Sequence, residues 1–449
     1  MSRNRFSHRI FLSPARFMNT ACRTAVVFCF ILLACVQPAQ AQSSSPFSRF
    51  GLGYLHNNAF SSNRALGEIG AGYSSHMYLN PTNPASYSEL TLTSFEVGAG
   101  LHAATIRTKD SLYNGFNGAM SHLALGFPLW RGRWGMSIGL LPYTNLNYNF
   151  TQSNIDTFKV YRGSGSLSQV YIGTGFKVKG FSFGINVGYV FGRLDYYRGF
   201  AFTDSLLALN SRNSAQARVG GFNYSVGVQY KTRLKKKTSD NALNSDINFT
   251  AGAYGAGGLK FNAKLSNNWE RYYYSNSAGT DIIIDTPLSY ANVQGKIVMP
   301  YNFGLGFTVG NEAWWIAGFD FTYAGWSKFS SPINPDKLAD SWRASLGLGI
   351  VPNVESKNFL ARVQYKGGAY YGNTNIVYAG KTLKEYGGTL GISLPVRISA
   401  IFREAARIHI SADIGSHNTG DKTLLSENYY RVFFGFTLSN LWFQKRKFD

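Results

Sequence analysis

Cysteine is almost absent from this 449-residue chain, and its placement is informative. All three cysteines, Cys22, Cys29 and Cys35, lie within the first 35 residues. If that region is removed as a leader, the remaining chain has no thiol, which excludes a disulfide scaffold and a thiolate metal site. Long apolar runs are equally scarce: outside residues 25–36, none approaches the 18 or more residues of a membrane-spanning helix.

The first 41 residues have the features of an export signal. They carry five Arg and no acidic residue, then an apolar run, then Ala39-Gln40-Ala41 with the small-x-small spacing of a signal-peptidase site. Met18 is an alternative start, and Cys35 after Leu32-Leu33-Ala34 is an alternative lipoprotein cleavage site. Each of these alternatives still predicts export across an inner membrane.

Charge is scarce and acidic residues especially so. Charged residues make up 15% of the chain, and 44 Lys and Arg against 23 Asp and Glu give a net charge of +21, or +16 once the five leader Arg are removed. An exported chain without a basic helix or zinc-finger spacing is not expected to bind nucleic acid. The phosphates of outer-membrane lipid or lipopolysaccharide, or an anionic solute in a pore, are the expected counterparts.

Glycine and aromatic residues are abundant instead, with 48 Gly, 34 Phe and 28 Tyr at a mean hydropathy of −0.13. Strict period-two alternation recurs in residues 181–192, 221–230, 341–350 and 407–415. In the first of these runs one face is small or polar, and the other is apolar: Phe181, Phe183, Ile185, Val187, Tyr189 and Phe191. Alternation alone also fits a soluble sandwich. Runs of 10 to 12 residues, aromatics near run ends and a small polar second face favour an all-β fold, a transmembrane antiparallel β-barrel.

Counting the runs predicts about fourteen strands, to within two because residues 265–290 are poorly patterned. An even number brings both termini to the periplasmic side of a bacterial outer membrane. The predicted short periplasmic turns are 131–133, 178–180, 311–313 and 355–357, and the predicted longer extracellular loops are 105–118, 203–214, 276–289, 331–340 and 372–383. The strands are predicted to start near residues 93, 119, 134, 158, 181, 215, 247, 290, 313, 341, 359, 384, 407 and 429.

Residues 42–91 precede the predicted barrel (92–449) and contain too many aromatic and branched apolar residues for a disordered tail. We expect this segment to fill the lumen as a plug, with a periplasmic docking tail as the alternative. Within it, residues 80–90 hold two Asn-Pro pairs, which are stiff turn formers. In the third predicted strand, Pro142 removes a ladder hydrogen bond, which predicts a bulge or a kink that parts two strands.

These features together resemble the long-chain fatty-acid channel family (the FadL/TodX type), in the branch that ends in a Trp-Phe-x-Lys-Arg-Lys tail. The matching stretches are residues 64–72, Asn83-Pro84-Ala85, Leu-Pro-Tyr at 141–143 and the tail from Leu441 to Lys447. The resemblance implies that Asn83, Pro84 and Ala85 belong to a lumenal hatch and that Pro142 and Tyr143 border a lateral opening. The doubled NPTNPA leaves open which Asn holds the family's position.

Three functions follow as hypotheses. The first is uptake of hydrophobic, fatty-acid-like small molecules by diffusion with lateral release, for which Arg343, Arg362, Lys366 and Arg431 are candidate lumen anchors. The second is a non-transporting barrel subunit of a type IX secretion or outer-membrane assembly complex, with protein partners.

The third hypothesis, an enzyme, is not expected, because the His residues after the leader form no catalytic or metal-ligand pattern. No cofactor is predicted. An apolar, ligand-sized lumen would favour transport, and a polar, filled lumen would favour the second hypothesis.

Overall fold

The structure is a computed structural model that describes residues 45–108, 112–202, 208–235, 246–275, 279–399, 404–421 and 423–441. The predicted leader (1–41) and the tail from Trp442 to Lys447 lie outside these ranges. Helical elements are short: η1 (Pro46–Arg49), α2 (Ser61–Arg64), η2 (Pro84–Glu89), η4 (Trp326–Lys328) and α3 (Phe359–Arg362).

Within the described ranges, no helix has the length and hydropathy needed to cross a membrane.

Strands make up most of the described chain. After the two-residue β1 (Tyr54–Leu55), they are β2 (Thr93–Arg107), β3 (Leu112–Trp130), β4 (Trp134–Ser153), β5 (Thr157–Val178), β6 (Phe181–Phe202), β7 (Asn210–Lys235), β8 (Ile247–Ala256), β9 (Lys260–Ser275), β10 (Thr280–Val298), β11 (Asn302–Asn311), β12 (Trp315–Ala324), β13 (Ser341–Ile350), β14 (Gln364–Tyr378), β15 (Lys381–Ser399), β16 (Glu404–Asn418) and β17 (Ser426–Asn440).

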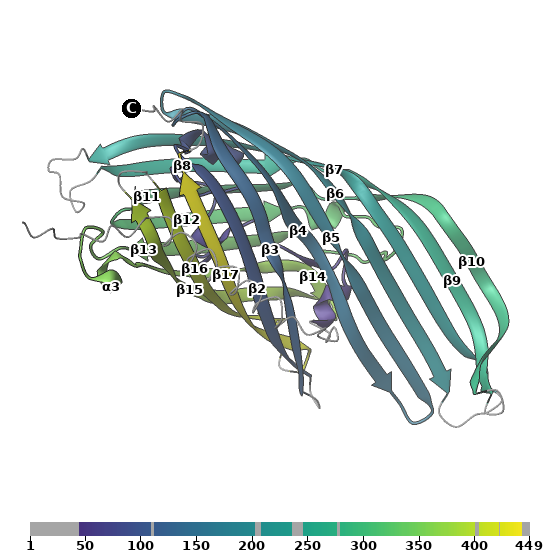
Figure 1. Cartoon of the computed structure of the whole chain (residues 1–449). Coiled ribbons are helices and arrows are strands. Elements are labelled where there is room, and N and C mark those ends of the chain that lie inside the picture. The colour runs from purple at the N-terminus through teal and green to yellow at the C-terminus, as the bar shows by residue number, and fades with distance from the viewer. Residues whose placement is uncertain are drawn as a thin grey trace, which may run out of the picture. The chain divides into compact units, whose positions relative to one another are not determined.

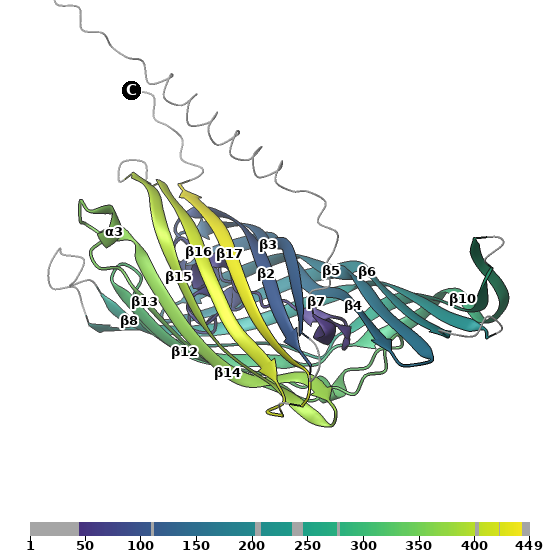
Figure 2. The same cartoon turned by 90° about the horizontal axis from the view of Figure 1, so that it is seen from below.

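These strands form a closed antiparallel barrel (Figures 1 and 2). The last strand, β17, pairs with β2 along its whole length and so completes the ring. Strands β8 and β9 both pair with β7 on successive stretches, so they share one position in the wall, interrupted at 257–259. Likewise β11 pairs with β8 and β10 with β9, with the interruption at Pro300. The strands β2 to β17 therefore occupy fourteen wall positions, which confirms the predicted fourteen-stranded barrel.

The barrel wall has an apolar outer face and a small, polar inner face. On β6 the large residues from Phe181 to Phe191 at alternate positions are exposed, whereas Ser182 and Asn186 between them are buried. Closure pairs the first and last strands of the barrel, β2 and β17, and so removes the open sheet edges that a lipid environment disfavours.

The strands differ greatly in length because part of the sheet continues beyond the membrane band. Strands β12 and β13 have 10 residues each, about the length of one membrane crossing, whereas β5 and β6 have 22 and β7 has 26. We call the outer parts of β5, β6, β7, β9 and β10 (residues 157–168, 193–202, 210–220, 260–275 and 280–298) the extension. It projects from one side of the barrel to the lower right of Figure 1.

On β6 the polarity of the two faces inverts in the extension, whereas β10 keeps exposed apolar residues at Ile283, Ile284, Leu288 and Val293. On β6, Leu194 and Tyr196 point inward and are buried, while Arg193 points outward and is exposed. The inner face packs against residues 325–340, which contribute Trp326, Phe329 and Leu338 to one hydrophobic cluster. The extension therefore has its own core.

Several predicted loops were wrong because strand pairing continues into them. Residues 276–289 are mostly β10, and residues 372–383 are strand except around the turn at 379–380. Outside the hydrocarbon region outward residues need not be apolar, so the alternation fades while the hydrogen-bonded ladder persists. Conversely, the strand predicted to start near residue 359 begins at Gln364, because α3 precedes it.

Candidate functional site

The segment from Ser45 to Leu92, here called the lumenal segment, lies inside the barrel wall (Figures 1 and 2). Residues 59–73 are all buried. Its side chains bond to inward-facing wall residues: the Tyr87 hydroxyl lies 3.1 Å from Asn186 Oδ1, and Ser88 Oγ lies 2.8 Å from Ser182 Oγ. The predicted role of this segment as a movable hatch remains a prediction.

Asn83-Pro84-Ala85 sits on a row of glycines in the wall. Asn83 caps η2 by accepting a hydrogen bond from the Ala85 N–H at 3.2 Å. Its amide group also donates to the carbonyl of Ala71 at 2.7 Å and to wall carbonyls of Val228 and Ala253 at 3.3 Å. The glycines beneath are register partners on β5, β6 and β7: Gly175, Gly184 and Gly227.

A side chain at these glycines would collide with the lumenal segment. A Cβ on Gly184 would overlap the backbone of Pro84 and Ala85, and one on Gly227 would overlap the Asn83 side chain. The small inner face of these strands thus matches the shape of residues 83–85. Of the two Asn-Pro pairs, it is Asn83-Pro84 that packs against these wall glycines.

A second set of wall contacts holds the turn at residues 65–71 on the opposite side of the barrel. The Asp320 carboxylate accepts hydrogen bonds from the N–H groups of Gly70 at 2.6 Å and Ala71 at 2.8 Å. Thr389 accepts from Gly67 N–H and donates to the Ala65 carbonyl, both at 2.9 Å. The lumenal segment is therefore fastened to both sides of the barrel.

Strand pairing breaks at Pro142. Strands β3 and β4 pair from Trp130 and Trp134 only as far as Leu123 and Leu140, and then part. Pro142 has no N–H to donate, and the pairing of β4 with β5 also slips between Pro142 and Thr144. We call the interval between β3 and β4 beyond this point the β3–β4 opening.

The strand β1 occupies the inner side of the β3–β4 opening. Tyr54 and Leu55 pair with Asn145 and Thr144 of β4, and the His56 N–H donates to the Tyr143 carbonyl at 3.1 Å. These contacts supply hydrogen bonds to a strand edge that β3 leaves free. The lumenal segment thus completes the wall where the barrel's own pairing stops.

Behind β1 lies a cavity of about 390 Å³. Residues of β3 border it on the side of the opening, and its other walls combine aromatic and charged side chains. The charged side chains that line it include Arg64, Glu68, Arg343, Glu385 and Arg431.

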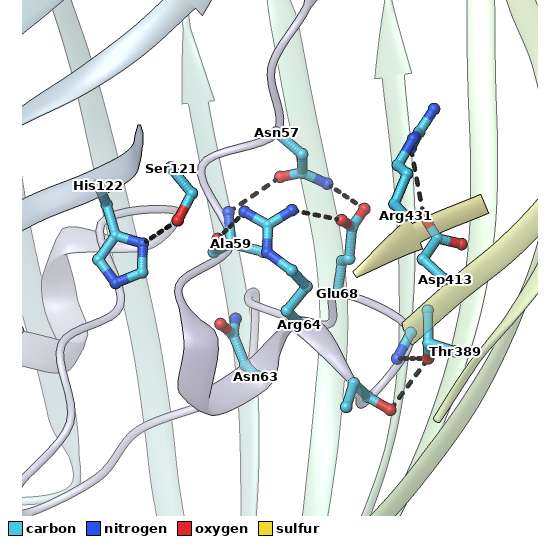
Figure 3. A network of polar contacts seen from close by, with 12 residues as sticks. Asn57, Ala59, Asn63, Arg64, Glu68, Ser121, His122, Thr389, Asp413 and Arg431 are labelled. Atoms are coloured by element: carbon cyan, nitrogen blue, oxygen red, sulfur yellow. Dashed lines mark hydrogen bonds and ion pairs between the residues drawn. The ribbon is translucent and has the colours of Figure 1, made fainter. Parts of the chain in front are cut away.

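The cavity contains a network of buried charges centred on Glu68. Its carboxylate lies 3.3 Å from Arg64 Nη1, 2.9 Å from Asn57 Nδ2 and 3.0 Å from Arg343 Nη1 (Figure 3 shows the first two). Glu68 has a φ of 64°, an unusual value for a residue other than glycine. A buried carboxylate needs such partners, since an unpaired charge would be costly.

Of the four predicted lumen anchors, two border this cavity. Arg343 lies 4.0 Å from Glu385 and stacks on Tyr370 at 3.9 Å. Arg431 pairs with Asp413 at 3.2 Å (Figure 3) and stacks on Tyr429 at 4.0 Å. Both guanidinium groups are thus already neutralised by acids of the protein.

The other two predicted anchors lie elsewhere. Lys366 is buried and donates to the Ser62 carbonyl of the lumenal segment, so it fastens that segment. Arg362 is the last residue of α3 in the connection between β13 and β14, where its guanidinium approaches Phe359. The structure therefore does not bring the four together at one site.

The described residues contain no group of three or more His, Cys, Asp or Glu side chains arranged to hold a metal. His409 bonds to Ser393 at 2.7 Å and to Thr437 at 3.1 Å, whereas Asp413 on the same strand bonds to Arg431 and Tyr370. This pair is part of the wall's polar packing.

Sequence reasoning did not single out Glu68, Asp320 or Glu385. The only local signal was the i,i+4 spacing of Arg64 and Glu68. The other two acids are single polar positions on alternating strands, and their importance comes from contacts across the lumen.

Solved structures with a similar fold include transporters of the FadL/TodX type. The toluene transporter TbuX of Ralstonia pickettii aligns with 13% identity over 86% of this chain and 100% of its own, with a TM-score of 0.52. The Pseudomonas putida toluene transporter TodX aligns with 15% identity over 87% of this chain and 99% of its own, with a TM-score of 0.51. A Pseudomonas aeruginosa FadL homologue aligns with 12% identity over 86% of this chain and 99% of its own, also with a TM-score of 0.51. At these identities the likeness shows the fold alone. The protein is thus a β-barrel with the FadL-type fold.

Within this fold class the chain belongs to the BamG family, whose model matches residues 21–449. No curated protein sequence matches the chain. The predicted resemblance to the FadL/TodX type is confirmed for the fold, and the family is BamG.

Proposed function

We propose that this protein is a closed barrel subunit of an outer-membrane assembly complex, the second of the functions expected from the sequence. The observation that carries the proposal is the lumen, which is filled by a segment fitted to wall glycines and held by buried ion pairs.

A filled, charged lumen is poorly suited to hydrophobic solutes. Binding sites for such ligands are mostly apolar with a few polar groups. The cavity lining is more apolar than polar overall, but Glu68, Arg343, Glu385 and Arg431 also border it, so an apolar ligand would share the cavity with their ion pairs.

Depletion of the protein tests this proposal. We expect the amounts of other folded outer-membrane β-barrels to fall, as measured by heat-modifiable gel mobility, before any defect in growth on a hydrophobic carbon source appears. Normal levels of the other barrels in fully depleted cells would overturn the proposal.

A second function, uptake with lateral release, is favoured by the β3–β4 opening and the cavity behind it. In this account a hydrophobic small molecule enters the cavity, β1 leaves the edge of β4, and the molecule passes between β3 and β4 into the membrane. The likeness to toluene transporters supports this account through the fold.

A disulfide between β1 and β4 separates the two functions. Leu55 and Thr144 are register partners, and opposed Cα atoms in an antiparallel pair are about 4.5–5.5 Å apart, within the disulfide range. The predicted mature chain has no other cysteine. We expect Leu55→Cys/Thr144→Cys to support barrel assembly when oxidised. Loss of hydrophobe uptake on oxidation, with recovery on reduction, would favour the channel.

A further inference from the structure

The outward face of the extension changes abruptly from apolar to basic, and this change locates the edge of the lipid-facing band. On β6, outward positions are apolar up to Tyr189 and Phe191, and the next outward residue is Arg193. On β7, Phe222 is the last large apolar outward residue, and Arg218 lies four residues beyond it. Lipid headgroups meet a barrel where its apolar band ends.

Three basic side chains stand next to one another at this edge. Arg193 of β6 is the register partner of Arg218 of β7, which is in turn the partner of Lys264 of β9. All three are exposed. Like charges directly opposite each other on neighbouring strands destabilise a sheet, so this row calls for an anion.

The protein supplies little of that negative charge itself. Arg193 pairs with Asp195 at 2.9 Å, but both side chains are well exposed, and such pairs contribute little. The next acids on this outward face, Glu270 and Asp281, are both held by Arg212 further along the extension. The row thus retains a net positive charge.

A groove bordered by polar and aromatic residues adjoins the row on the side away from the apolar band. It has a volume of about 680 Å³. The next register row, Ser164, Asp195, Gln216 and Ser266, contributes to its floor, and Arg162, Tyr197 and Asn268 lie beyond. Hydroxyl, amide and aromatic groups on a shallow surface are suited to sugar hydroxyls and sugar rings.

We propose that the extension binds the phosphorylated sugar headgroup of an outer-leaflet glycolipid. The phosphate would lie on Arg193, Arg218 and Lys264, the sugar in the groove, and the acyl chains against Phe191, Tyr189 and Phe222. The basic row and the groove lie side by side at the end of the apolar surface, where the phosphates and sugars of such a lipid meet its acyl chains. This site is independent of whether the barrel assembles proteins or transports solutes.

The test is binding of purified lipid A to the full-length barrel in detergent, measured by native mass spectrometry and by titration. The variant is Arg193→Gln/Arg218→Gln/Lys264→Gln. The matched control removes three positive charges near the short turns at the other end of the barrel, Arg131→Gln/Arg133→Gln/Lys179→Gln. Because charge-assisted contacts to phosphate dominate, we expect the variant to weaken binding about tenfold or more and the control to leave it unchanged. Binding should also weaken as salt is raised.

Two further measurements keep the test decisive. Heat-modifiable mobility of each variant establishes that the barrel is folded. Phosphatidylglycerol provides the phosphate without the sugars, and we expect it to bind more weakly than lipid A. Equal loss in the variant and the control, unchanged binding in the folded variant, or equal affinity for both lipids would each overturn the proposal.

Discussion

Glycines in the barrel wall decide how closely the lumenal segment can approach. Gly184 faces Pro84 and Ala85 so closely that even a methyl group would overlap their backbone, which cannot move aside as a flexible side chain could. At Gly388, by contrast, an added Cβ would make only an ordinary contact, 3.6 Å from the Gly368 carbonyl oxygen. These two positions form a matched pair of test sites on one barrel.

We expect Gly184→Ala to displace residues 83–85 while leaving the barrel folded. The physical reason is the steric overlap, together with loss of the hydrogen bonds that Asn83 makes to wall carbonyls. Limited proteolysis should cut within residues 75–92 faster in Gly184→Ala than in the wild type, and Gly388→Ala should match the wild type. Equal cleavage in all three would mean that the glycine row does not fix the segment.

Glu89 is a second residue whose contacts hold the lumenal segment. Its carboxylate lies between Lys177 of β5 and Lys231 of β7 and forms an ion pair with each. The distance from the carboxylate to Lys231 Nζ is 2.8 Å. Burial raises the pKa of Glu89, but the two ammonium groups, Lys231 foremost, outweigh this and hold the pKa below its ordinary value. A carboxylate with a lowered pKa stabilises the folded contact above its unfolded pKa, and this stabilisation is lost as the pH falls through the lowered value.

Hydrogen exchange of residues 84–90 should therefore be independent of pH between about 7 and 5, once corrected for intrinsic rates, and protection should decrease below about pH 4.5. In Glu89→Gln the protection of residues 84–90 should be lower at neutral pH, and it should no longer decrease as the pH falls below about 4.5. If wild type and Glu89→Gln lost protection in parallel below pH 4.5, another group would be responsible.

At the scale of elements, the sequence predicted strands well and connections poorly. The predicted starts at 93, 134, 181, 247 and 341 match the structure, because the lipid-facing alternation begins there. Strand β10 was missed over residues 280–289, since its outward side chains face water and show no alternation. Its bulges, with Asn292 at a φ of 57°, further disturb the pattern.

The connection between β12 and β13 is an element that the sequence classified only as a loop. Its Trp326 is 7% exposed and packs on Phe329 and on the inner face of the extension. It therefore acts as the cover of a hydrophobic core that lies outside the membrane band.

We expect Trp326→Ala to loosen this cover, since removing a buried Trp costs about 3–5 kcal/mol. Hydrogen exchange should rise in residues 326–338 and in the facing residues 261–265, with no change in β14 to β17. Trp130→Ala is the control, because Trp130 is 56% exposed on the outer face. Uniform destabilisation of the whole barrel by Trp326→Ala would contradict an independent core in the extension.

At the scale of the molecule, the barrel and its strand number could be predicted from the alternation. The contacts inside the lumen could not be predicted from it. Arg343 and Arg431 were predicted as lumen anchors. The structure pairs Arg343 with Glu68 of the lumenal segment, and Arg431 with Asp413, its register partner on the neighbouring strand β16. No local pattern specifies the pair of Arg343 and Glu68, because it depends on how the lumenal segment threads the ring. The same holds for β1, whose two residues gain their importance only from the gap beside Pro142.

The most direct test of the central claim is native mass spectrometry of the protein extracted gently from outer membranes, followed by analysis of bound small molecules. The proposed role predicts a complex in which this barrel and a second outer-membrane β-barrel occur in a fixed ratio, without a stoichiometric hydrophobic solute. A lone barrel carrying one fatty acid or other hydrophobic molecule would contradict this role and would favour the channel.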